Sequence, residues 1–186
     1  MLQTFEKELD NINKEFYKYV CTIEKSLLNN KLDEDFFLID LKEFDNKLIK
    51  FLALYHPQGE YLRTIIAYLK SSSFLFKIKK SVKNCLKKEI PQNPKINALY
   101  QNALTTITTL KIAINSDDIE DAYSSIISYE KIADELYKEL LIEVKKIEDI
   151  EEVLKLLNIA KKLERISDST KTIIMYLLFA KEGLDL

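Results

Sequence analysis

The sequence predicts an all-α protein of six helices, arranged as a tandem repeat of two three-helix bundles. Only two glycines and three prolines occur among 186 residues. Because these are the residues that most often interrupt helices, the composition favours long helices. Apolar residues recur at steps of three and four through six segments, as expected when one face of each helix is buried. Segments separated by 88 residues carry similar apolar patterns, and a proline-rich break lies between them.

The first half of the chain, residues 1–90, is expected to hold three helices. The first covers residues 2–28 and ends at a run of polar residues. The second is expected over residues 33–56, with three acidic residues in its first turn, where the helix dipole favours them. Pro57 ends it, because the residue before a proline disfavours helical geometry. The third helix then continues to about residue 88.

A proline-rich segment, residues 89–94, is the predicted boundary between the two halves. The second half, residues 91–186, begins with a fourth helix over residues 96–114. A fifth helix follows, and Ser116 or Asp117 is expected to cap its first turn, because their side-chain oxygens can accept backbone N–H groups.

The last two helices carry the clearest apolar patterns. The fifth is predicted to bury a heptad-like seam, formed by Ala122, Ile126, Tyr129, Ala133, Leu136, Leu140, Val144 and Ile147. A turn at residues 148–149 leads into the sixth helix, which is expected to run to Gly183. Its buried stripe is formed by Leu156, Ile159, Ala160, Leu163, Ile166, Thr170, Ile173 and Leu177.

Composition limits the classes of function. The net charge of −2 provides no general basic field for nucleic acid or anionic lipid. Cys21 and Cys85 lie far apart, so neither a disulfide framework nor a thiolate metal site is indicated. The longest apolar run, residues 173–180, is far shorter than the roughly 20 residues that cross a bilayer, and the first residues do not form a signal peptide. We expect a cytoplasmic protein, peripheral to the membrane at most.

Two pairs of acidic residues are the main candidates for a metal site. Glu164 and Asp168 lie four residues apart on the sixth helix, and Glu130 and Asp134 repeat this spacing on the fifth. Helices joined by a short turn pack antiparallel, so the two pairs can face one another. Four convergent carboxylates repel unless a cation or raised pKa values relieve them. An all-oxygen site of this kind suits Mg, Mn, Fe(III) or Zn.

The alternative to a metal site is a solvated acidic surface. In this interpretation Lys161 and Arg165 are the local ion partners of the acidic residues, and the surface meets a basic partner without metal. Catalysis is not indicated, because the sequence contains no nucleophile–base arrangement and too few glycines for a phosphate-binding loop.

Two strings in the sequence resemble those of a known family. Residues 159–168, IAKKLERISD, resemble the signature helix I-A-R-x-L-E-R-I-G-D of the PhoU family of phosphate-signalling regulators. Ser167 stands where that family usually has glycine, a change that costs little in a helix. Residues 57–66, PQGEYLRTII, are similar to the family's P-x-A-x-D-L-R-x-I-I, with Gly59 in place of alanine. The resemblance covers nearly the whole chain and implies a PhoU-like tandem repeat of three-helix bundles.

The resemblance also implies a function. PhoU-like proteins are non-enzymatic regulators of phosphate uptake and phosphate-responsive signalling, and they contact the ATPase of the phosphate ABC importer, a sensor histidine kinase, or both. A homodimer is a further expectation. The family holds iron or zinc clusters on E/D-x-x-x-D motifs, which by resemblance correspond to Glu130, Asp134, Glu164 and Asp168. The alternatives are an accessory protein of a low-affinity phosphate permease, or a metal-binding or purely structural helical bundle.

The first half departs from the acidic pattern. The 88-residue offset places Phe76 and Lys80 at the positions of Glu164 and Asp168. A phenyl ring and an ammonium group cannot ligate a hard cation. A metal cluster is therefore expected at the second half only.

A group of lysines on the third helix is a candidate anion or partner site. The four residues gather on about one quarter of the helix, given roughly 100° per residue; they are Lys79, Lys80, Lys83 and Lys87. They could bind a phosphate, an anionic lipid head group or an acidic partner. The alternative is an ordinary solvated face, which is the more common role of such a run.

Overall fold

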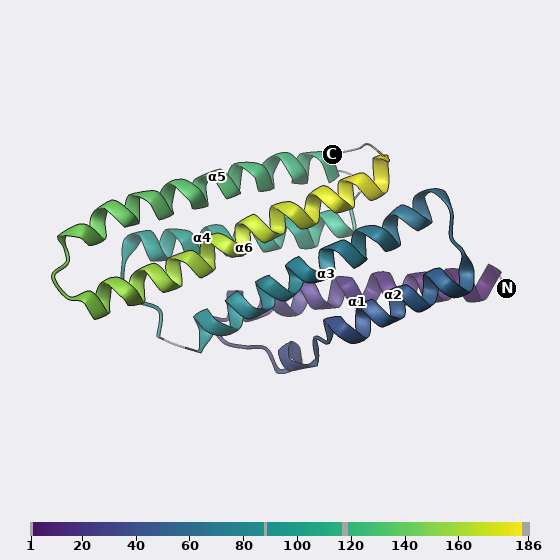
Figure 1. Cartoon of the computed structure of the whole chain (residues 1–186), viewed down its shortest axis with the longest axis horizontal. Helices are drawn as coiled ribbons and strands as arrows, with labels where there is room; N and C mark the ends of the chain where they lie inside the picture. The colour runs from purple at the N-terminus through teal and green to yellow at the C-terminus, as the bar shows by residue number, and fades with distance from the viewer. Residues whose placement is uncertain (1, 88, 117–118, 184–186) are drawn as a thin grey trace.

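The computed structural model describes residues 2–87, 89–116 and 119–183, and in these ranges long α-helices run side by side (Figure 1). The elements, in order, are α1 (Leu2–Leu28), the 3₁₀ helix η1 (Glu34–Leu38), α2 (Leu41–Tyr55), α3 (Gly59–Leu86), α4 (Pro94–Ile114), α5 (Ile119–Glu143), the 3₁₀ helix η2 (Val144–Lys146) and α6 (Ile150–Glu182). The predicted all-α class with six α-helices is therefore confirmed. Across the described ranges, no helix has the length and apolar content needed to span a bilayer.

The second helix of the sequence prediction is wrong in one respect, because the chain forms η1 and then α2 instead of one continuous helix. The carboxylate of Asp33 caps η1, and that of Asp40 caps α2 by accepting the backbone N–H groups of Lys42 and Glu43 at 3.1 and 3.0 Å. An aspartate in this role starts a new helix. Between the two caps, η1 buries the ring of Phe36 completely.

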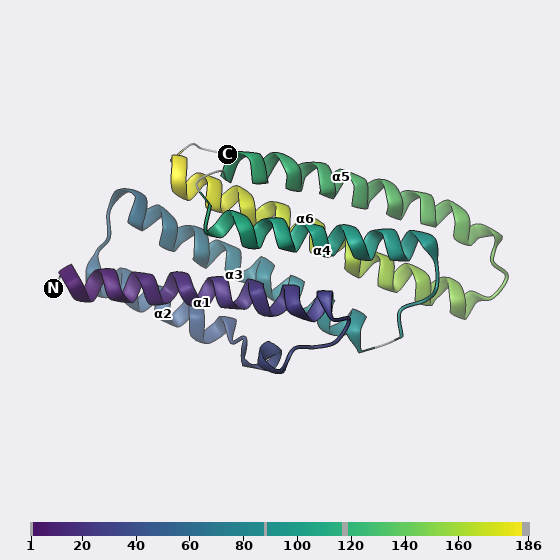
Figure 2. The ribbon, with the colours of Figure 1, turned by 180° about the vertical axis from the view of Figure 1, so that it is seen from behind.

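The α3–α6 pair runs through the middle of the molecule and connects its two groups of helices (Figure 1). On one side α3 contacts α1 and α2, and on the other α6 contacts α4 and α5. A second connection lies where α1 packs beside α4 (Figure 2). One hydrophobic core extends through all six helices. The division into domains at residues 1–90 and 91–186 stays a prediction.

A residue of the second family-like segment, residues 57–66, connects the start of α3 to the end of α6 by a hydrogen bond. The guanidinium Nε of Arg63, in the first turns of α3, donates to the carbonyl oxygen of Ala180 at 3.1 Å. Gly183 ends α6 in the left-handed region, with a φ of 69°, and its N–H donates to Phe179. Such a residue commonly ends a helix, because only glycine adopts this backbone without strain. In the same last turn of α6, the hydrogen bond from Arg63 satisfies the carbonyl oxygen of Ala180.

The predicted apolar seams are buried to different degrees. Every residue of the α6 stripe is buried, because this helix packs against α3, α4 and α5. Only half of the seam predicted for the fifth helix is buried, namely Ile126, Ala133 and Leu140 on α5 and Val144 on η2. The other half is partly exposed, because α5 lies at the edge of the bundle (Figure 1). Of the two predicted α5 caps, Asp117 lies outside the described residues, whereas the N–H of Ser116 donates to Ala113 at the end of α4.

A largely buried ion pair links α1 to α4. Glu24 accepts hydrogen bonds from Lys111 Nζ at 2.6 Å and from the Thr108 hydroxyl at 3.0 Å. Its side chain is only 11% exposed. A carboxylate this far from water needs such partners to offset its lost hydration.

We expect Glu24→Ala to lower the free energy of unfolding by about 2 kcal/mol, because it leaves Lys111 and Thr108 without their shared acceptor. Urea denaturation followed by circular dichroism measures this change. Asp10→Ala is the matched control, since Asp10 pairs with Lys14 at 2.6 Å on the exposed surface of α1, where such a pair contributes less than about 1 kcal/mol. Equal losses in the two variants would contradict the assigned role of Glu24.

The two cysteines should differ sharply in reactivity. Cys85 is fully buried, and burial raises the pKa of its thiol to about 12, so almost no reactive thiolate forms near neutral pH. Cys21 is only partly buried. We expect iodoacetamide to label the folded Cys21→Ser variant very slowly at about pH 8 and to label it readily in urea. Fast labelling of that variant without denaturant would contradict the packing of α3.

Candidate functional site

The four predicted acidic residues lie on two neighbouring helices. Glu130 and Asp134 are on α5, and Glu164 and Asp168 are on α6. The two helices pack together along their length and are joined by η2 and a short turn. Asp149 ends that turn and caps α6 by accepting the N–H of the residue two positions on, at 2.9 Å. The structure therefore places both pairs on adjoining helices, as the sequence predicts.

A lysine lies between the acids of α5 and α6. Lys171 Nζ is 2.8 Å from Glu130 Oε1 and 4.0 Å from Asp168 Oδ1. The Lys171 and Glu130 side chains are 28% and 20% exposed, whereas Asp168 is 53% exposed. The ammonium group thus supplies positive charge to one carboxylate on each helix. Lys171 is not among the residues predicted from the sequence, although its position three residues after Asp168 places it on the same side of the helix.

The remaining two acids pair with lysines on their own helices. Glu164, with a side chain 13% exposed, is 2.9 Å from Lys161 Nζ, which also lies 5.1 Å from the ring centroid of Tyr137 on α5. Asp134 is 3.3 Å from Lys138 on the exposed side of α5. The predicted ion partner Lys161 is therefore in place. Arg165, the other predicted partner, forms no ion pair within the described residues and lines a cavity with residues of α2 and α3 instead.

The arrangement can be tested against a metal cluster. Within residues 2–87, 89–116 and 119–183, no group of three or more His, Cys, Asp or Glu side chains is placed to hold a metal ion. Glu130 and Asp168 share Lys171, and the other two acids each have their own lysine. A cation would need these same oxygens. As they lie, the four carboxylates do not fit a metal cluster, and an iron or zinc site stays a prediction.

Two of the four predicted anion-binding lysines make contacts within the chain. Lys79 Nζ donates to the carbonyl oxygen of Ile39 and lies 5.9 Å from the ring centroid of Phe36. Lys83 Nζ lies 5.4 Å from the ring centroid of Phe37. Burial, and then the neighbouring charge of Lys83, lower the pKa of Lys79. These two lysines therefore pack the η1 segment against α3.

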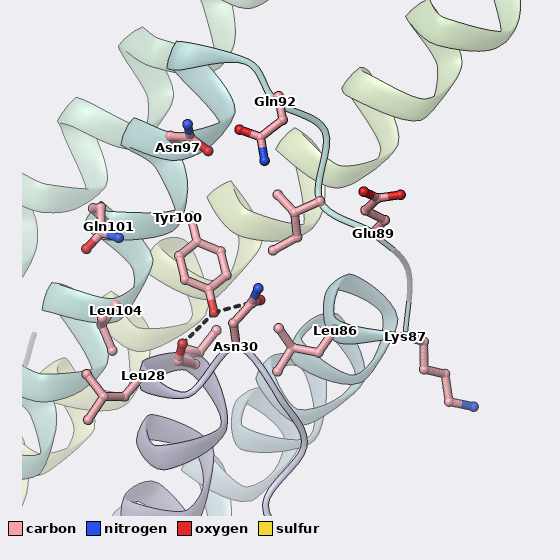
Figure 3. A pocket seen from close by; sticks show the side chains of 12 residues that line it. Leu28, Asn30, Leu86, Lys87, Glu89, Gln92, Asn97, Tyr100, Gln101 and Leu104 are labelled. Atoms are coloured by element: carbon pink, nitrogen blue, oxygen red, sulfur yellow. Dashed lines mark hydrogen bonds between the residues drawn. The ribbon is translucent and has the colours of Figure 1, made fainter.

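The other two lysines of the group are exposed and border different cavities. Lys87 lies at the rim of a cavity of about 860 Å³ where α1, α3 and α4 meet (Figure 3). Inside it, the Tyr100 hydroxyl donates to the carbonyl oxygen of Leu27 and lies 3.4 Å from Asn30 Oδ1 (Figure 3). In the close-up the Lys87 side chain points away from this group. Lys80 instead lines a cavity between α2, α3 and α6. Anion binding by all four lysines together stays a prediction.

Comparisons with known proteins support the family resemblance. Residues 96–177 match the family model of the PhoU domain, and this range contains all four acidic residues. A search of curated proteins finds no match.

Two solved structures share the fold of the whole chain. One is PhoU from Pseudomonas aeruginosa, with 21% sequence identity, a TM-score of 0.71 and 98% of each chain covered. The other is the phosphate transport system regulatory protein PhoU from Streptococcus pneumoniae, with 20% identity, a TM-score of 0.71, and 100% of this chain and 98% of that chain covered. Residues 96–177 are thus similar to the PhoU domain, and the chain shares the fold of these two PhoU structures over its full length.

Proposed function

We propose that this protein is a non-enzymatic regulator of phosphate uptake and phosphate-responsive signalling. The observation that carries the proposal is the PhoU domain at residues 96–177, together with a fold shared along the whole chain with a protein named a phosphate transport system regulator. Such a regulator acts by binding one state of a partner more tightly than another. The proposed partners are the ATPase of a phosphate ABC importer and a sensor histidine kinase.

The α5–α6 surface is the proposed contact with a partner. Its acids lie 2.8 to 4.0 Å from lysines of the same chain. A basic side chain of the partner can replace the lysine at Asp134 or Asp168, which are 45% and 53% exposed. Charges of this kind steer the encounter and set its specificity. The end of the helix pair, where α5 leads into α6, exposes large apolar side chains, as the centre of an interface requires; they are Ile142, Ile150 and Leu154.

The same proposal places the protein in the cytoplasm. It reaches the membrane only by binding its partner. The apolar end of α5 and α6 also offers a surface for a homodimer, which the resemblance implies. The competing proposal is an accessory role beside a low-affinity phosphate permease. In that case the protein regulates the permease and not the ABC importer.

The first test is genetic. Deleting the gene should raise phosphate uptake and the activity of a phosphate-responsive reporter several-fold in phosphate-rich medium, because the restraint on the importer and kinase is lost. Asp134→Lys with Asp168→Lys should fail to restore regulation, since reversed charges repel a basic partner. Asp10→Lys, on the exposed surface of α1, is the matched control and should restore it.

Two other outcomes of this test have definite meanings. Unchanged uptake and reporter activity after deletion would contradict the proposal. An effect that persists without the importer, and disappears without the permease, would favour the accessory role.

We further propose that the acidic surface binds a metal ion in one form of the protein. This form requires Lys171 to move away from Glu130 and Asp168. We expect Lys171→Ala to leave Glu130 and Asp168 without their shared cation, so that millimolar Mn²⁺ or Zn²⁺ raises the melting temperature of this variant more than that of the wild type. Lys138→Ala is the control, because Lys138 pairs with Asp134 and with no second acid among the described residues. Strong stabilisation of the wild type by these ions would contradict the role given to Lys171 and support the metal-bound form.

A further inference from the structure

We propose that a pocket between α2, α3 and α6 binds a phosphate-type oxyanion, either free or as part of a larger molecule. The pocket has a volume of about 550 Å³. Four cationic side chains from all three helices line it: Lys42 from α2, Lys77 and Lys80 from α3, and Arg165 from α6. Only Lys80 belongs to the lysine group that the sequence singled out.

Positive charge exceeds negative charge in the lining of this pocket. Within the described ranges of the chain, none of the four cations forms an ion pair, unlike the lysines of the α5–α6 surface. Among the described residues of the lining, Asp45 is the one acid, and its Oδ1 atom is buried without a hydrogen-bond partner. Four cations facing one carboxylate, in a protein with a net charge of −2, form a local site that attracts anions.

Two of the four acidic positions of the second half are occupied by lysines in the first half. The 88-residue offset relates Lys42 to Glu130 and Lys80 to Asp168. The position that corresponds to Glu164 is occupied by Phe76, an exposed residue that lines the pocket. The first half therefore has a basic pocket where the second half has an acidic surface. A metal ion is repelled by such a lining, whereas an oxyanion is attracted.

The lining groups suit phosphate chemistry. The guanidinium group of Arg165 can donate two parallel hydrogen bonds to phosphate oxygens, and the lysines act as point charges. The hydroxyl of Ser72, a largely buried residue of α3, is a further donor in the lining. The apolar lining residues Leu41 and Phe76 leave room for the organic part of a phosphate ester. The volume exceeds the needs of inorganic phosphate, so either source of the group fits.

The experiment uses the purified full chain and titrates inorganic phosphate at low, constant ionic strength, with binding measured by calorimetry. Lys80→Ala and Arg165→Ala should each weaken binding roughly tenfold or more, because each removes a charge-assisted contact. Asp45→Asn should strengthen it several-fold by removing the one opposing charge. Lys50→Ala, on the exposed side of α2 and outside the pocket, is the matched control and should bind as the wild type does. All of these positions except Asp45 are exposed, and circular dichroism verifies that each variant is folded.

Two further probes identify the source of the phosphate group. Ribose 5-phosphate tests a soluble ester, and vesicles containing phosphatidic acid in a phosphatidylcholine background test a lipid head group. Tighter binding of either one than of inorganic phosphate, with the same dependence on Lys80 and Arg165, supports the site and names its ligand class.

The proposal is overturned if none of the three probes binds, if chloride at the same ionic strength competes as well as phosphate, or if the variants at Lys80, Arg165 and Asp45 bind like the wild type. The site is inferred from its charge and geometry alone and goes beyond the proposed regulatory function. Phosphate binding by the purified protein would therefore stand even if deletion of the gene left phosphate uptake unchanged.

Discussion

The packing of α3 against α6 positions both charged regions of the molecule. These two helices bury small polar residues as well as apolar ones, among them Ser71 on α3 and Ser169 on α6. Their hydroxyl oxygens are buried without hydrogen-bond partners, which costs free energy that the surrounding apolar contacts must offset. Small side chains allow two helices to approach closely, so a larger residue at either position would push them apart. Arg63 adds a hydrogen bond from the start of α3 to the end of α6.

Because α6 packs against α3, α4 and α5, successive residues along it lie on different surfaces of the molecule. Glu164 points to the α5 side, where it pairs with Lys161 beside Tyr137, whereas Arg165 lines the pocket shared with α2 and α3. A step of one residue turns the helix by about 100°, which is enough to separate an acidic surface from a basic one. The two regions need no extra loops or domains to stay apart.

Much of this fold follows from local pattern, and the exceptions have physical causes. The α6 stripe is predicted correctly because a fully surrounded helix shows its period clearly. The second helix is mispredicted because apolar periodicity continues across the break, while the side chain of Asp40 satisfies the first N–H groups of α2 and so allows a new helix to begin there. At the candidate site the sequence predicts which helices carry the acids. It cannot show that Lys171 reaches Glu130, because that contact depends on the rotation of α5 against α6.

The acidic residues of α5 and α6 contribute little to the packing that holds these helices together. Apolar residues such as Ile126 and Leu140 are fully buried in that contact, and each stabilises it by roughly 1.5 to 3 kcal/mol. The Glu130–Lys171 pair remains about a quarter exposed, so water and salt screen it and its contribution is at most about 1 kcal/mol. Side chains that fold stability does not require can change partners at small cost. The acids of the α5–α6 surface can therefore exchange a lysine of their own chain for a basic group of another protein. A carboxylate as buried as Glu24 cannot make this exchange at small cost.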